Sequence, residues 1–135
     1  MPRPLLLSLI LLSFSMPAAA ERVQDPDPES PQFALIDGLK LVRDGHYELF
    51  ITQWCHPGLL CATPDAFMQL QRNVLPGLRP KIDSCISGGA LQVLSLDGDV
   101  EAHDAQLVFV LDCGAAGQHT VKIHWYKAKW WITEI

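Results

Sequence analysis

The stretch HTVKIHWYKAKWWITEI, residues 119–135, decides the fold. Apolar and polar residues alternate along it with a period of two, on both sides of a short break centred on Ala128. A period of two predicts β-strands, because successive side chains of a strand point to opposite faces of a sheet. The break is short enough for a hairpin turn. The pattern therefore predicts two antiparallel strands, over residues 119–126 and 130–135.

Two further segments, 91–96 and 105–113, show the same alternation. The connections between the segments contain Asp-Gly and Gly-rich sequences, which are typical of turns. The sequence thus predicts a four-stranded antiparallel meander in which each strand pairs with the next. Counting outward from the turns pairs Leu91 with Leu107, and Trp125 with Trp131.

The residues before this meander have helical spacing. Ser30 and Pro31 are a typical N-cap and first helical residue, and Gly45 is a natural stop. A second helix is predicted over residues 46–54, and a third from Thr63 to about residue 74, where prolines interrupt. Helices followed by an antiparallel meander predict an α+β domain, with N-terminal helices packed on a curved four-stranded sheet.

The length and charge limit the class of protein. The chain has 135 residues, enough for a single domain, and its net charge of −5 argues against nucleic-acid binding. Residues 1–20 resemble a cleaved signal peptide, with Arg3, an apolar run and a small-residue cleavage site. Residues 21–30 are predicted to be a flexible acidic, proline-rich leader, and residues 31–135 the domain. We expect a periplasmic or secreted protein without a membrane anchor after cleavage.

The predicted pairing gives the sheet two different faces. The odd-numbered face is almost entirely apolar and is expected to pack on the helices. Lys122 falls opposite Glu134 on the other face, where a cross-strand ion pair is predicted. Contiguous apolar residues on an exposed face often mark a contact with another molecule. The even-numbered face is therefore the candidate contact surface for a protein partner or homodimer, and its residues are Gln106, Val108, Val110, Lys122, His124, Tyr126, Trp130 and Ile132.

Four cysteines in an exported chain predict two disulfides. Extending the first hairpin places Cys85 opposite Cys113, which leaves Cys55 and Cys61 to close a short loop. A zinc site is the alternative, but the chain has no C-x-x-C pair.

Catalytic motifs are not evident. The side chains that titrate near neutrality are His46, His56, His103, His119 and His124, of which His124 lies mid-strand beside Tyr126. The chain has no nucleophile elbow, phosphate loop or H-E-x-x-H motif. We therefore predict no catalytic residue, no cofactor and no metal.

The order of elements resembles a known family. The helical segment 33–44, the break over residues 44–47 and the closing KWWITEI, residues 129–135, resemble the nuclear-transport-factor-2-like (cystatin-like) fold, in particular its small exported domains. The resemblance implies a curved sheet around helices, a pocket in the cone and dimerisation through the sheet. Some members are isomerases or dehydratases built on buried Asp, His and Tyr, but none of these catalytic residues has a matching position here.

These observations favour an exported, non-enzymatic binding module that acts through protein contact. One version is a periplasmic immunity or inhibitor protein. Two alternatives stay open: a small apolar ligand bound in the cone cavity, and an isomerase, dehydratase-like or hydrolytic enzyme.

Overall fold

The computed structural model describes residues 21–102 and 106–135. The predicted signal peptide lies outside these residues, as does His103. The helices are α2 (Pro31–Arg43), α3 (Tyr47–Trp54), α4 (Pro64–Gln69), the π-helical η1 (Leu70–Val74), α5 (Leu75–Cys85) and the 3-10 turn η2 (Gly114–Ala116). The strands are β1 (Glu21–Val23), β2 (Ile86–Ser87), β3 (Ala90–Asp97), β4 (Gln106–Asp112), β5 (Gln118–Tyr126) and β6 (Lys129–Glu134). The described part of the chain contains no helix with the length and apolarity needed to cross a bilayer.

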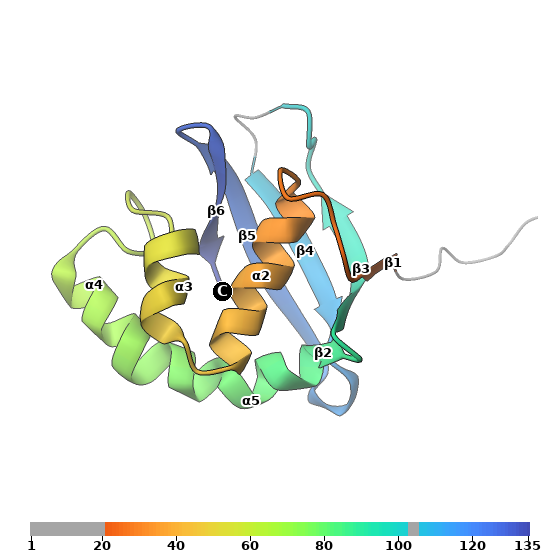
Figure 1. Cartoon of the computed structure of the whole chain (residues 1–135), viewed down its shortest axis with the longest axis horizontal. Coiled ribbons are helices and arrows are strands. Elements are labelled where there is room, and N and C mark those ends of the chain that lie inside the picture. Colours follow the sequence, from red (N-terminus) through yellow and green to blue (C-terminus); the bar gives the residue numbers. More distant parts are fainter. Residues whose placement is uncertain (1–20, 103–105) are drawn as a thin grey trace, which may run out of the picture.

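The predicted α+β class is confirmed. The antiparallel sheet has the order β1-β3-β4-β5-β6, with β2 also paired to β3, and α2 runs across it in Figure 1. Side chains of β4 alternate between buried and accessible, because one face of the sheet packs on the helices. The prediction of four strands is wrong, since two short strands extend the sheet beside β3.

One of these extra strands comes from the predicted leader. Glu21–Val23 pairs with Val93–Leu91 of β3, so the first three residues of the predicted leader form a strand of the sheet. Val23 is only 4% exposed and joins the core, which gives this short strand its anchor.

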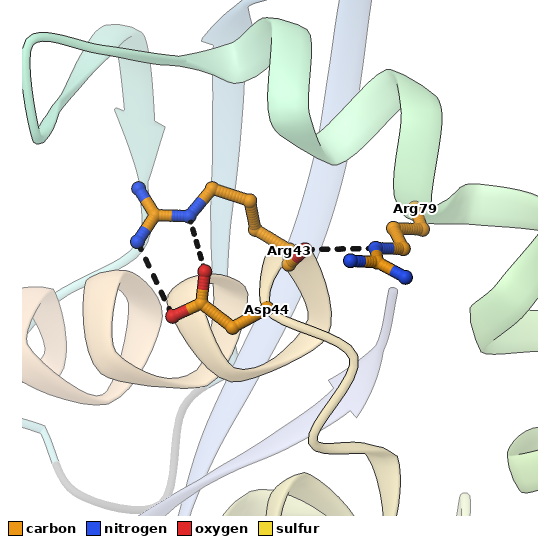
Figure 2. A network of polar contacts seen from close by, with 3 residues as sticks. All are labelled: Arg43, Asp44 and Arg79. Atoms are coloured by element: carbon orange, nitrogen blue, oxygen red, sulfur yellow. Dashed lines mark hydrogen bonds and ion pairs between the residues drawn. The ribbon is translucent and has the colours of Figure 1, made fainter.

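Helix α2 begins and ends as predicted. The Ser30 hydroxyl accepts a hydrogen bond from the Phe33 N–H (3.3 Å). At the other end, Arg79 of α5 donates from Nε to the carbonyl of Arg43 (2.8 Å), and Arg43 pairs with the Asp44 carboxylate, as Figure 2 shows. Arg79 thus binds one of the carbonyls that a helix end leaves without a partner, and joins α2 to α5.

The prediction that the third helix ends near residue 74 is wrong, because η1 and α5 continue it to Cys85. Pro76 lies in the first turn of α5, directly after the π-helical η1. Pro80 lies inside α5, a position that costs about 3 kcal/mol relative to Ala. Burial of Leu75 and Ile82 on the core side of α5 offsets this cost.

The predicted register of the first hairpin is also wrong. Val93 pairs with Leu111 and Leu96 with Phe109, instead of Leu91 with Leu107. The connection between β3 and β4 is longer than the predicted Asp-Gly turn, and a bulge follows Val93. The sequence shows neither the longer connection nor the bulge, and each of them shifts the pairing of the two strands.

The last hairpin differs from the prediction by one residue. Its turn has two central residues, Lys127 and Ala128, with φ of 50° and 60°. Trp125 therefore pairs with Trp130, and His124 with Trp131. A shift of one residue exchanges the faces of a strand.

This shift corrects two of the candidate contact residues. Trp130 and Ile132 are 4% and 0% exposed, and they belong to the core instead of the even-numbered face. A second irregularity, between Lys122 and Ile123, restores the predicted pairing further along. Lys122 and Glu134 consequently form the expected ion pair (3.5 Å).

Both predicted disulfides, Cys55–Cys61 and Cys85–Cys113, are present. The predicted position of Cys85, in an extension of the β3–β4 ladder, is wrong, because Cys85 ends α5. The bridge instead joins the end of α5 to the residue that follows β4. Both cysteines of this bridge are buried, with Cys85 1% and Cys113 0% exposed.

Candidate functional site

The face of the sheet opposite the helices is the candidate site, and we call it the open face. It contains six of the predicted contact residues, together with Trp131 in place of Trp130. Most of these side chains are half-buried by their neighbours on the sheet. The residues of the open face are Gln106, Val108, Val110, Lys122, His124, Tyr126, Trp131 and Thr133.

Polar contacts hold the rim of the open face. Gln106 donates from its amide to the Thr133 hydroxyl (3.1 Å), and that hydroxyl donates to the carbonyl of Lys122 (3.2 Å). These bonds connect β4, β5 and β6 across the sheet. The face is therefore an ordered surface with apolar residues on β4 and polar partners around them.

A short disulfide loop covers one end of the open face. Helix α3 ends at Trp54, and Cys55 forms a parallel bridge with Ile132 of β6. The His56 N–H donates to the Ile132 carbonyl (2.9 Å), while the His56 carbonyl accepts from the N–H of Cys61 (3.1 Å). These bonds fix the Cys55–Cys61 loop against β6, an edge strand of the sheet.

The ring of His56 lies among the aromatic residues of the open face. It is 6% exposed and lies 4.6 Å from the Tyr126 ring and 6.2 Å from the His124 ring, between centroids. Its Nδ1 accepts a hydrogen bond from the Gly58 N–H (2.9 Å), which requires an unprotonated Nδ1. Burial lowers the pKa of His56, and the charge of His124 lowers it further. The neutral imidazole is therefore the form that fits this position.

Sequence reasoning missed His56 as a member of this site. The sequence predicts His56 in a loop after the second helix, and only the pairing of Cys55 with β6 brings it to the open face. The Cys-His sequence inside a short disulfide loop was the one available signal. That sequence does not indicate which way the His56 ring points.

Lys129 links the open face to the helices. Its ammonium lies 4.3 Å from the centroid of the Trp131 ring and 4.6 Å from that of Trp54, and it donates to the carbonyl of Gln53. Burial lowers the pKa of Lys129, while the negative charge of Asp37 opposes that shift. A lysine held between two indole rings is a cation–π arrangement.

The other titratable groups lie elsewhere in the fold. The Asp37 carboxylate of α2 accepts from the Trp54 indole N–H (2.7 Å). His119 lies at the start of β5, where its Nε2 is buried without a hydrogen-bond partner among the described residues. Burial, followed by the charge of Lys81, lowers the pKa of His119. Within the described ranges, the acidic, His and Cys side chains form no cluster of three that could hold a metal ion.

A groove of about 780 Å³ opens at one end of the molecule. It lies between the residues leading into α2, the β3–β4 connection and the β5–β6 turn. Its walls are formed by Asp27, Pro28, Glu29, Ser30, Pro31, Gln32, Ala34, Trp54, Val100, Glu101, Trp125, Ala128, Lys129 and Trp130. The groove is separate from the main residues of the open face.

Comparison with known proteins gives no match, whether to a family model, to a curated protein or to a solved structure.

Proposed function

We propose that this chain is an exported, non-catalytic binding protein, and that its open face contacts a basic protein partner. The observation that carries the proposal is the burial pattern of β4, whose core side packs on the helices while Val108 and Val110 remain accessible on the other side. A sheet face with accessible apolar and aromatic residues can be covered by another protein.

The composition of the open face supports a protein contact. Tyr126 and Trp131 are the residue types that contribute most at protein interfaces. Lys122, Glu134 and Gln106 lie around them and give a polar rim. The Trp131 side chain is also already ordered, since its indole N–H donates to the backbone carbonyl of Tyr126 (2.8 Å). An ordered surface loses little side-chain entropy on binding.

The charge of the chain favours a basic partner. The net charge of −5 would steer a positively charged protein toward this one. The two disulfides are compatible with an extracellular or periplasmic location. A small acidic protein in such a compartment fits the role of an immunity or inhibitor protein, which blocks an enzyme by covering it.

The engagement of the titratable groups supports a non-catalytic role. His56 uses Nδ1 to hold its own loop, and Asp37 holds the Trp54 indole. Each of these groups stabilises the fold in its present position. We also propose that the fold is a variant of the nuclear-transport-factor-2-like cone, which the order of helices before a meander supports.

Site-specific photo-crosslinking in the native cell tests the proposal. A benzophenone amino acid replaces Val110 on the open face or, as the control, exposed Met68 on α4. We expect Val110 to crosslink one basic protein that Met68 does not reach, and Tyr126→Ala with Trp131→Ala to abolish the crosslink. The same products from both positions, or crosslinks only to a second copy of this chain, would overturn the proposal.

A further inference from the structure

The Cys55–Cys61 loop is held by two kinds of hydrogen bond. The backbone carbonyl of His56 accepts from the N–H of Leu59 (3.2 Å) and from that of Cys61 (3.1 Å). The His56 side chain adds a third bond, in which Nδ1 accepts from the Gly58 N–H (2.9 Å). A backbone carbonyl does not titrate, whereas a protonated imidazole nitrogen is a donor and cannot accept a hydrogen bond. The bond to Gly58 is therefore the one of the three that depends on pH.

The position of the His56 ring disfavours a positive charge. The residue is 6% exposed, and its ring centroid lies 6.2 Å from that of His124. Burial lowers the pKa of His56, the charge of His124 lowers it further, and a contact with the backbone raises it by a smaller amount. The neutral ring that holds Gly58 is thus also the form that the surroundings favour.

The other titratable groups near the ring do not offset an added positive charge. The ammonium of Lys127 lies 5.3 Å from the centroid of the Tyr126 ring, on which His56 packs. Glu134 is the only acidic residue in residues 118–134, and it already pairs with Lys122 (3.5 Å). The loop sequence, residues 56–63, has no acidic residue. The titratable groups on β5, on β6 and in the turn between them are His119, Lys122, His124, Tyr126, Lys127, Lys129 and Glu134.

We propose that His56 is a pH-sensitive latch for the tip of this loop, residues 57–60. With a neutral imidazole the latch is closed, and Nδ1 holds the Gly58 N–H. When Nδ1 takes up a proton from water it becomes a donor, so the bond to Gly58 breaks and the tip detaches from the ring. The base of the loop stays on β6, because the Cys55–Cys61 disulfide and the bond between the His56 N–H and the Ile132 carbonyl do not titrate.

The latch would regulate one end of the open face. The loop covers that end, and the His56 ring lies 4.6 Å from the Tyr126 ring. Protonation places a positive charge beside Tyr126 and His124, which should weaken the contact with a basic partner. This consequence rests on the function proposed above. The latch itself depends only on the loop, so it can be tested without a partner.

NMR of the chain with ¹⁵N labelling, combined with amide hydrogen exchange from neutrality down to about pH 5, tests the latch. We expect the protection of the Gly58 amide, relative to its intrinsic exchange rate at each pH, to fall in step with protonation of the His56 ring. The loss should be about fivefold or more, because one hydrogen bond is broken. The Cys61 amide is the control within the same loop, and its protection should change less than about twofold, because its acceptor is a carbonyl.

Three variants sharpen the test. His124→Gln removes the like charge, so the Gly58 transition should move toward neutral pH. His46→Gln removes an exposed imidazole that precedes α3 and should leave the midpoint unchanged. His56→Gln should abolish the transition, because the titrating ring is lost, and His124→Gln keeps the test valid if His56→Gln does not fold.

Two results would overturn the proposal. In the first, the Gly58 amide stays protected while the His56 ring is protonated. In the second, the amides of Gly58 and Cys61 lose protection together, because the whole loop then opens and His56 does not act on its tip alone.

Discussion

His124 lies directly opposite Trp131 in the β5–β6 hairpin, and both side chains are therefore on the open face. The pairing follows from a turn with only two central residues, Lys127 and Ala128. Trp130 and Ile132 consequently point to the core, where Trp130 is 4% and Ile132 is 0% exposed. The conformation of this turn thus decides which tryptophan another protein can reach.

The turn itself gives the first prediction. Ala128 has a φ of 60°, a left-handed conformation that costs a non-glycine residue about 1 kcal/mol. Ala128→Gly should therefore raise the free energy of unfolding by about 1 kcal/mol, measured by urea denaturation. Ala116, in the 3-10 turn η2, is not among the residues with positive φ, so Ala116→Gly should lower it by about 0.5–1 kcal/mol. If both substitutions changed the free energy of unfolding in the same direction, the left-handed conformation of Ala128 would be contradicted.

The contact between α2 and β6 gives the second prediction. A Cβ added at Gly38 would lie 2.7 Å from the Cδ1 of Ile132 and 3.3 Å from the Phe50 ring. Both neighbours are fully buried and have little room to move. Gly38→Ala should lower the free energy of unfolding by about 1 kcal/mol, since overpacking outweighs the better helix propensity of Ala.

Gly77 is the matched control for Gly38. It lies in α5 with nothing within 4 Å of an added Cβ. Gly77→Ala should raise the free energy of unfolding by about 0.5–1 kcal/mol. If Gly38→Ala stabilises the chain as much as Gly77→Ala does, then α2 does not pack on Ile132 as described.

The two disulfides should differ in their contributions to stability. Cys85–Cys113 spans 28 residues of sequence and Cys55–Cys61 spans 6. A longer closed loop restricts the unfolded chain more, so replacing the first pair with Ala should cost about 3–4 kcal/mol and the second about 2 kcal/mol. Thermal and urea denaturation of the two double variants measure the order, and the reverse order would refute it.

Stability should fall as the pH is lowered below neutrality. Burial lowers the pKa of both His56 and His119 in the folded chain, whereas the unfolded chain titrates near the ordinary value of about 6.5. The unfolded state then binds protons first, so the full stability is present above about pH 6.5 and decreases as the pH falls toward the lower folded-state pKa values.

Urea denaturation at a series of pH values between neutrality and the carboxylate range measures this loss. His119→Gln should make the decrease smaller, because one of the two groups is removed. The exposed His46 serves as the control, and His46→Gln should retain the full decrease. A free energy of unfolding that rises on acidification through this range would show that the two imidazoles are not buried as neutral groups.

The sequence predicts which segments form helices and strands better than it predicts how the strands pair and where the third helix ends. The alternation in residues 119–135 and the Ser30-Pro31 start of α2 depend on local chemistry, and both are confirmed. The helix continues past Pro80 because Leu75 and Ile82 of α5 are buried in the core. No local sequence signal indicates that burial.

The candidate site shows the same division. The alternation of β4 and β5 correctly placed Val108, Val110 and His124 on one face. The register of β6 depended on whether Lys127 and Ala128 adopt positive φ, which is uncommon for such residues and was not expected. His56 reaches the site through a tertiary pairing with Ile132, and the sequence carries no direct sign of that contact.

The central claim is that the open face, and not the helical surface, contacts a protein partner. Its most direct test is the affinity of the crosslinked partner for Val110→Arg compared with Met68→Arg, measured by calorimetry with purified proteins. The account predicts that Val110→Arg weakens binding at least about tenfold, because a buried unpaired charge at an interface costs more than 1.4 kcal/mol, while Met68→Arg changes it less than about twofold. Equal affinities for the two variants would contradict it.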